Sequence, residues 1–303
     1  MIDAIELIFI YHINIMTSAT NIVCLLIIIM MILYYLFLTE YHSSIKCIIA
    51  DHSYNKMLLD HEKRKEYPMK IEGNDITTNH GSDYFKFFDR LGETRVVSCI
   101  LNNKIVASAC SVLRDINDTK VWYLNNLRVE DEYKGLNLPY RMFKHGFIYS
   151  LRKSSQCYYI DTGKEDTKHI KKIEVSSYFR FKESGRLYIY IFDYDFMLNM
   201  HMVIGKHMGK ISYLSLDGIQ NYNSDENKLN ILHLQWGSYG KHTGENVYKY
   251  PQKNYKHMFC IHENNKLKNI LDKLEIEPNN VYNIVQYGMN RTDWDFILTS
   301  DFC

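Results

Sequence analysis

The chain has 303 residues and a formal net charge of +1, with 36 Lys and Arg against 35 Asp and Glu. That length accommodates one large domain or two modest ones. The balanced charge argues against a global basic field, so no nucleic-acid partner is predicted. The seven cysteines are scattered and show no C-x-x-C spacing. Zinc and redox motifs are therefore unsupported, no metal site is predicted, and a reducing compartment fits this pattern.

A long apolar run lies near the N-terminus, over Ile22–Leu38. A helix needs roughly 20 residues to cross a hydrocarbon core about 30 Å thick. We therefore expect a tail over 1–20 and a single transmembrane helix over 21–40. The alternative, a buried core helix, needs an apolar partner surface on every side. Because residues 1–21 lack Lys and Arg and Lys63-Arg64-Lys65 follows the run, the C-terminal body is predicted to face the cytosol.

Residues 41–80 are polar and weakly periodic, and are interpreted as a stalk or linker with one helix over Asn55–Glu66. Residues 81–199 alternate between strand-like and helix-like patterns. The predicted helices of this part are Asp83–Leu91, Pro139–Arg152 and Lys168–Tyr178. Its predicted strands are Arg95–Leu101, Ile105–Leu113, Val121–Val129, Cys157–Asp161 and Arg186–Asp193. Asn102-Asn103 between the first two strands is typical of a hairpin turn.

Residues 200–303 form a second predicted part, rich in strands. Its expected strands are Lys210–Leu216, Asn230–Trp236, Met258–His262, Val281–Tyr287 and Trp294–Thr299, with one helix over Asn264–Leu274. This order fits either an appended sheet domain or a second, diverged copy of the first part. The sequence shows no repeat that would decide between them.

The most informative stretch is Val121–Phe147, in which an apolar strand leads through a Lys-Gly loop to an amphipathic helix. A loop of free backbone amides at a helix N-terminus is suited to binding phosphate. Leu127–Pro139 runs in step with the V-x-P-E-Y-R-G-K-G-I-G motif of the GNAT acyltransferases, and Phe181-Lys182 matches a second family pattern. The chain thus resembles the GNAT superfamily over about 95–195.

The resemblance implies an α/β (α+β) fold with a central mixed sheet flanked by helices. A second β-rich α+β domain and the transmembrane helix would complete the chain. It also implies an N-acyltransferase that uses acetyl-CoA, or a longer acyl-CoA, as co-substrate and an unidentified amine as acceptor. The loop amides of the family hold the pyrophosphate, and here they belong to Lys134, Gly135, Leu136, Asn137 and Leu138.

The loop departs from the family pattern, because Asn137 and Pro139 replace two glycines. Asn tolerates positive φ, so Asn137 is expected to hold a left-handed turn, whereas Pro139 lacks an N–H. In the family a backbone N–H of the splayed strand polarises the thioester carbonyl. Here that donor falls within Leu127–Val129, with Leu127 and Val129 as candidates.

Glu130 is the preferred catalytic base among the acidic residues Glu130–Glu132, because it follows the strand directly. The alternative is that these residues only favour the positive end of the next helix. Ser176 occupies the position of the usual acid Tyr, and Tyr178 is the candidate substitute, with an ordinary packing role as the alternative. Two further interpretations stay open: a catalytically inactive GNAT-like interaction module tethered to a membrane, and an unrelated α+β domain.

Overall fold

A computed structural model of the protein describes residues 23, 26–31, 44–64, 69–71, 74–161, 180–216, 220–222, 228–237, 246–289 and 293–302. The chain divides into two units, Met1–Lys46 and Cys47–Cys303. Most of the predicted transmembrane helix and all of the predicted helix Lys168–Tyr178 lie outside the described residues. Within the described part, no helix is long and apolar enough to cross a membrane.

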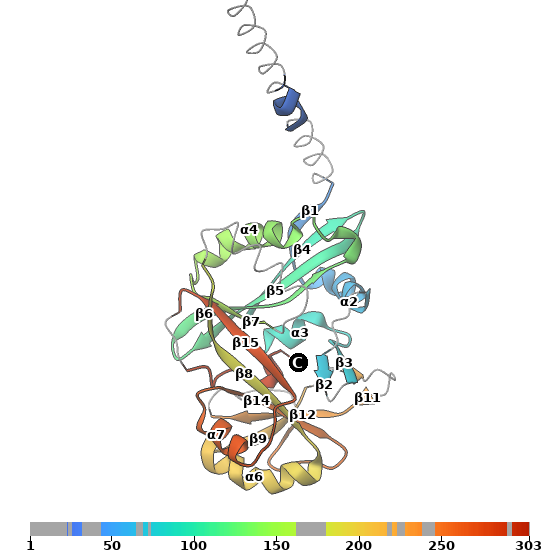
Figure 1. The fold of residues 1–303 in the computed structure, drawn as a ribbon. Helices are drawn as coiled ribbons and strands as arrows, with labels where there is room; N and C mark the ends of the chain where they lie inside the picture. The colour runs from blue at the N-terminus through green and yellow to red at the C-terminus, as the bar shows by residue number, and fades with distance from the viewer. Residues whose placement is uncertain are drawn as a thin grey trace, which may run out of the picture. The chain divides into compact units, whose positions relative to one another are not determined.

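The second unit is an α+β fold built on one mixed sheet of 11 strands, in the order β1-β4-β5-β6-β7-β15-β8-β14-β12-β9-β13 (Figure 1). These strands are β1 Lys46–Ala50, β4 Glu93–Leu101, β5 Lys104–Ile116, β6 Thr119–Val129, β7 Cys157–Asp161, β8 Lys182–Phe192, β9 Ile211–Ser215, β12 Ile231–Trp236, β13 Asn246–Tyr248, β14 Lys256–His262 and β15 Asn280–Tyr287. A smaller sheet has the order β11-β10-β3-β2. Its strands are β2 Met69–Ile71, β3 Asn74–Asn79, β10 Gln220–Tyr222 and β11 Lys228–Leu229.

Helices cover both faces of the large sheet. The α-helices are α2 Asn55–Arg64, α3 Tyr84–Asp89, α4 Leu138–Leu151, α6 Tyr194–Met208 and α7 Lys266–Lys273, and the 3-10 turns are η1 His52–Tyr54, η2 Asp131–Tyr133 and η3 Thr299–Asp301. Val96 packs with the buried residues of α2 and α3, whereas Val97 contacts Gly146 of α4. Neighbouring residues of a strand point to opposite faces, so α2 and α3 cover one face and α4 the other.

The hairpin turn predicted from the Asn-Asn dipeptide is confirmed between β4 and β5. Asn102 and Asn103 connect the strands with φ values of 49° and 59°. Positive φ at both central residues matches the right-handed twist of the flanking strands, and Asn is among the side chains that tolerate it. Both strands extend slightly beyond the predicted bounds.

The strands predicted for a second domain lie in the same sheet as those of the first. β15 pairs antiparallel with both β7 and β8, and β8 pairs on its other edge with β14. The predicted boundary between 199 and 200 falls inside α6. Residue alternation predicts a strand but not its partner, so the sequence alone could not reveal this shared sheet.

The region predicted as a stalk, 41–80, contributes to the folded unit. β1 is the edge strand of the large sheet, and α2 buries Leu58, His61 and Glu62. These three positions have the i, i+3, i+4 spacing of one helix face. Two of these residues, His61 and Glu62, are polar. The pattern of apolar residues alone therefore does not indicate that this helix face is buried.

The predicted strand Trp294–Thr299 is wrong, because the described residues 293–298 are irregular, with one turn at 295–296, and lead into η3. Trp294, Phe296, Ile297 and Leu298 are all buried. Consecutive burial of this kind does not identify a strand, although β12 buries all six of its residues as one. Asp301 anchors this segment, since its Oδ2 accepts a hydrogen bond from Arg114 Nη1 of β5 at 2.8 Å.

Candidate functional site

The loop between β6 and α4 has the backbone geometry expected of a phosphate-binding turn. Gly135 has φ 89°, and Asn137, the N-cap of α4, has φ 53° and ψ 29°. The left-handed turn expected at Asn137 is therefore confirmed. Its side chain makes no capping hydrogen bond, and Pro139 occupies the first turn of the helix. The N-terminus of α4 thus leaves its backbone donors without a side-chain cap.

Some of the loop amides are already engaged within the turn. Lys134 N–H donates to the Asp131 carbonyl at 3.2 Å, and Leu136 N–H donates to the Tyr133 carbonyl at 3.4 Å. Within the described residues, Gly135, Asn137 and Leu138 donate no backbone hydrogen bond. A Cβ placed on Gly135 would meet no atom within 4 Å. The donors available to an anion therefore come from the second half of the loop rather than from Lys134 and Leu136.

Lys134 itself is held near the loop by an acidic neighbour. Its Nζ lies 2.7 Å from Asp131 Oδ1, and the Asp131 side chain is 69% exposed. Ion pairs of this exposure contribute little stability. The ammonium group can therefore exchange this carboxylate for a phosphate at small cost.

β6 and β7 separate directly before this loop. The two strands pair in parallel only at Trp122↔Cys157 and Tyr123↔Tyr158, although β6 continues to Val129. The separation opens at the carboxyl ends of parallel strands, which is where open sheets of this kind bind ligands.

A β-bulge interrupts β6 next to this separation. The register between β5 and β6 shifts between Ser108 and Cys110, opposite Asn126, which has φ 49°. Beyond the bulge, Glu130 N–H donates to the Val106 carbonyl of β5 at 3.0 Å. Because N–H groups alternate in direction along a regular strand, we expect that of Val129 to be directed away from β5, while Leu127 lies at the bulge, where this alternation is interrupted. These are the two residues expected to polarise a thioester carbonyl.

Glu130 lies at the end of β6 and faces α2 and the start of β5. Its Oε1 accepts from Arg64 Nε at 2.8 Å, and its Oε2 accepts from Lys104 Nζ at 2.7 Å. Burial raises the pKa of Glu130, but the hydrogen bonds from Lys104 and Arg64 outweigh burial, so the net pKa is below its ordinary value. Glu130 is therefore an ionised carboxylate of reduced basicity. Asp131 and Glu132, by contrast, are exposed.

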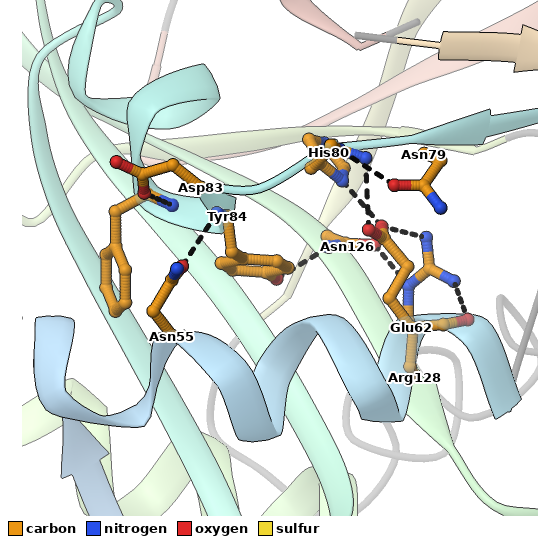
Figure 2. A network of polar contacts seen from close by, with 10 residues as sticks. Asn55, Glu62, Asn79, His80, Asp83, Tyr84, Asn126 and Arg128 are labelled. Atoms are coloured by element: carbon orange, nitrogen blue, oxygen red, sulfur yellow. Dashed lines mark hydrogen bonds and ion pairs between the residues drawn. The ribbon is translucent and has the colours of Figure 1, made fainter. Parts of the chain in front are cut away.

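A buried polar network that the sequence reasoning missed lies behind the bulge (Figure 2). Glu62 Oε1 accepts from Arg128 Nη2 at 3.0 Å and lies 2.5 Å from His80 Nδ1. Arg128 Nε donates to Asn126 Oδ1 at 2.6 Å, and Asn126 Nδ2 donates to the Tyr84 hydroxyl at 2.6 Å. The network thereby links α2 and α3 to Asn126 and Arg128, the residues on either side of Leu127. These hydrogen bonds stabilise the conformation of the bulge.

His61 on α2 is fully buried and lies 3.4 Å from Glu130, from Nδ1 to Oε1. Burial lowers the pKa of His61 to about 4, although Glu130 attracts its proton. Between roughly pH 6.5 and 4 the unfolded chain therefore binds a proton that the folded chain does not. The free energy of unfolding should fall as the pH drops through this range.

His61→Leu should flatten this pH dependence by up to about 1.4 kcal/mol per pH unit. Urea unfolding at a series of pH values measures the slope, with the exposed His52 changed to Leu as the control. His257, whose pKa burial also lowers to about 4, should leave a residual slope in the variant. An unchanged slope in His61→Leu would show that His61 is protonated equally in both states.

Tyr178, the predicted acid, lies outside the described residues, so its role stays a prediction. The same holds for Ser176. The nearest described residues in sequence on either side of that segment are Asp161 at the end of β7, which is buried, and Arg180, which is exposed.

Comparisons with known proteins give one sequence relative. No family model matches the chain. An uncharacterized protein, L340 of Acanthamoeba polyphaga mimivirus, is 27% identical over 234 residues, which cover 73% of this chain and 68% of the relative.

Several solved structures have a similar fold. A proposed acetyltransferase from Pyrococcus horikoshii has a TM-score of 0.48 at 10% identity, covering 86% of this chain and 95% of that one. A GNAT-family acetyltransferase from Streptococcus pneumoniae has a TM-score of 0.37 at 9% identity, covering 47% and 86%. Arabidopsis thaliana Naa50, solved with the bisubstrate analogue CoA-Ac-MVNAL, has a TM-score of 0.34 at 12% identity, covering 47% and 86%. The alignments with the second and third of these structures each span about half of this chain.

Proposed function

We propose that this protein transfers an acetyl or longer acyl group from acyl-CoA to an amine. The proposal rests on one observation: the separated strands β6 and β7 lead directly to the N-terminus of α4, which has no side-chain cap. The β6–β7 opening leads within a few residues to the positive-φ loop and to α4. A thioester and the pyrophosphate of one acyl-CoA molecule need these two kinds of donor at neighbouring positions.

In this mechanism the pyrophosphate binds the N–H groups of Gly135, Asn137 and Leu138, aided by the positive end of α4. The thioester carbonyl accepts hydrogen bonds from Leu127 and Val129. Their backbone donors stabilise the oxyanion that forms when the amine attacks, and they do so whatever their side chains are.

The proton lost by the attacking amine must reach a base, and the leaving thiolate must gain one. Glu130 is the proposed base; its lowered pKa keeps it ionised, and so able to accept a proton, but reduces its strength as a base. Tyr178 is the proposed acid for the thiolate. Removing Glu130 should then lower kcat more than it raises KM.

A second candidate function is acyl-CoA binding without transfer. The ion pairs of Glu130 with Arg64 and Lys104 favour it, because a carboxylate engaged in this way is a poor proton acceptor. Binding without measurable turnover across a panel of amines would support this candidate over the transferase. Membrane attachment and a cytosolic location stay predictions for either function.

Gly135→Trp is expected to abolish acetyl-CoA binding, with a loss of at least about 100-fold in affinity, since each 1.4 kcal/mol corresponds to a factor of ten. The variant places a large side chain where an anion would approach and strains a residue with φ 89°. Isothermal titration of acetyl-CoA into the protein and the variant measures the effect.

Gly209→Trp is the matched control, because Gly209 also has positive φ and open space but lies after α6. The control should bind acetyl-CoA like the unmodified protein. If acetyl-CoA, myristoyl-CoA and desulfo-CoA all fail to bind the unmodified protein, both candidate functions are wrong.

A further inference from the structure

Two cysteines from distant parts of the sequence meet on neighbouring strands. Cys47 Sγ of β1 lies 2.8 Å from Cys99 Sγ of β4, and the two strands are hydrogen-bonded neighbours. Both thiols are free. Cys99 is completely buried, whereas Cys47 is half-buried and so accessible to a small solute. Because a disulfide has an S–S length near 2.05 Å, closing this pair requires a sulfur movement of less than about 1 Å.

The surroundings of the pair favour a reactive thiolate. The hydrogen bond with the Cys99 thiol lowers the pKa of Cys47 to about 7, against the effect of burial, and the charge of Arg141 on α4 adds to the lowering. Burial instead raises the pKa of Cys157 to about 12 and also raises that of Cys110. The thiolate is the species that reacts with oxidants. Cys47 is therefore chemically distinct from the isolated buried cysteines.

We propose that Cys47 and Cys99 are a modification site at which a peroxide produces a reversible disulfide. The Cys47 thiolate attacks the peroxide, so that an S–O bond forms, the O–O bond breaks and, with one proton taken up, water leaves. The Cys99 thiol then attacks the resulting sulfenic acid, forming the S–S bond and releasing a second water. The peroxide is reduced and two thiols are oxidised. A dithiol reductant reverses the reaction by exchange.

The disulfide would lie in the part of the sheet that leads to the candidate site. Cys99 is opposite Ala107 of β5, and Ala107 is opposite Val129 of β6, so the pair belongs to the cross-strand row that ends at the β6 opening. The residues between the two cysteines include α2 and α3, which carry the network behind the bulge. Oxidation would therefore close a covalent loop that contains both helices, with its two ends fixed on neighbouring strands of the sheet.

The test uses the full chain, treated with stoichiometric hydrogen peroxide and digested without reduction. Mass spectrometry should show a Cys47–Cys99 linked peptide that disappears with dithiothreitol. Cys110→Ser should still form the link, because Cys110 is a buried cysteine outside the pair. In Cys99→Ser, dimedone should trap a sulfenic acid on Cys47. In Cys47→Ser, position 99 should stay unmodified, because it is buried.

Thermal unfolding gives a second readout. The oxidised protein should melt on the order of 5–10 °C above the reduced protein, because the bond closes a loop of about 50 residues in the unfolded chain. Cys99→Ser should show no such shift. If peroxide produces no linked peptide, or if Cys47 proceeds to sulfinic acid while Cys99 stays a thiol, the proposal is wrong.

Discussion

Replacing Asp301 with alanine should lower the free energy of unfolding by about 3–5 kcal/mol, because it leaves a buried guanidinium without its counter-charge. Arg114 Nη1 donates to Asp301 Oδ2 and to the Tyr158 hydroxyl, each at 2.8 Å. Arg114 is 7% exposed and Asp301 is 1% exposed. Burial lowers the pKa of Arg114, but the attraction of Asp301 outweighs burial and raises it above its ordinary value. The hydrogen bond to the Tyr158 hydroxyl and the contact with the Phe296 ring do not replace the lost counter-charge.

Urea unfolding of the variant measures this effect. Asp272→Ala is the matched control, because Asp272 pairs with Lys268 at the surface, and it should cost less than about 1 kcal/mol. Combining Asp301→Ala with Arg114→Met should recover part of the loss, since the double variant has no unpaired charge. A cost below 1 kcal/mol for Asp301→Ala would show that Arg114 reaches solvent or another acceptor.

Glu62→Ala is expected to destabilise the fold by a similar amount, about 3–5 kcal/mol, because Glu62 is the acceptor shared by Arg128 and His80. The three side chains are at most 8% exposed. The loss should also loosen the β6 bulge, since Arg128 holds Asn126 there. Acetyl-CoA titration of the folded variant should therefore show weaker binding, in addition to the lower unfolding midpoint in urea.

The pH dependence of this effect has a definite sign. Burial raises the pKa of Glu62, but the charges of His80 and Arg128 outweigh burial, so the net pKa is below its ordinary value. The stability that the ionised carboxylate contributes is present above the ordinary carboxyl pKa and is lost as the pH falls through the lowered one. The difference between the protein and Glu62→Ala should therefore shrink in acid.

Glu93→Ala is the control for Glu62. Glu93 pairs with Lys153 and Arg95, and its side chain is 44% exposed. Its removal should cost less than about 1 kcal/mol at any pH. Equal costs for Glu62→Ala and Glu93→Ala would contradict the assignment of a buried, charge-dependent network.

Local elements were the easiest features to predict from the sequence. The strand Cys157–Asp161 has the predicted bounds, and α4 differs from its predicted bounds by one residue at each end. Val121–Val129 lies within β6. These segments are set by local alternation, by Pro and Gly, and by turn chemistry, all of which can be read within about ten residues.

The candidate site was predicted in part for the same reason. The left-handed conformation of Asn137 depends on its residue type and on the neighbouring loop, so it could be expected in advance. The network of Glu62, His80 and Arg128 could not, because its members are far apart in the chain and meet only when α2 packs on β6. A buried polar residue at helical spacing, such as Glu62 beside Leu58, was the one local signal available.

The sequence by itself thus determined the β6–loop–α4 motif, its glycine and asparagine turn, and most of the strands, because these follow from short-range sterics and periodicity. Tertiary structure alone decided that β15 lies between β7 and β8, that Glu130 is held by Arg64 and Lys104, and that Cys47 meets Cys99. Each of these depends on which distant segments pair. That choice is made by the packing of the whole core, and no local pattern encodes it.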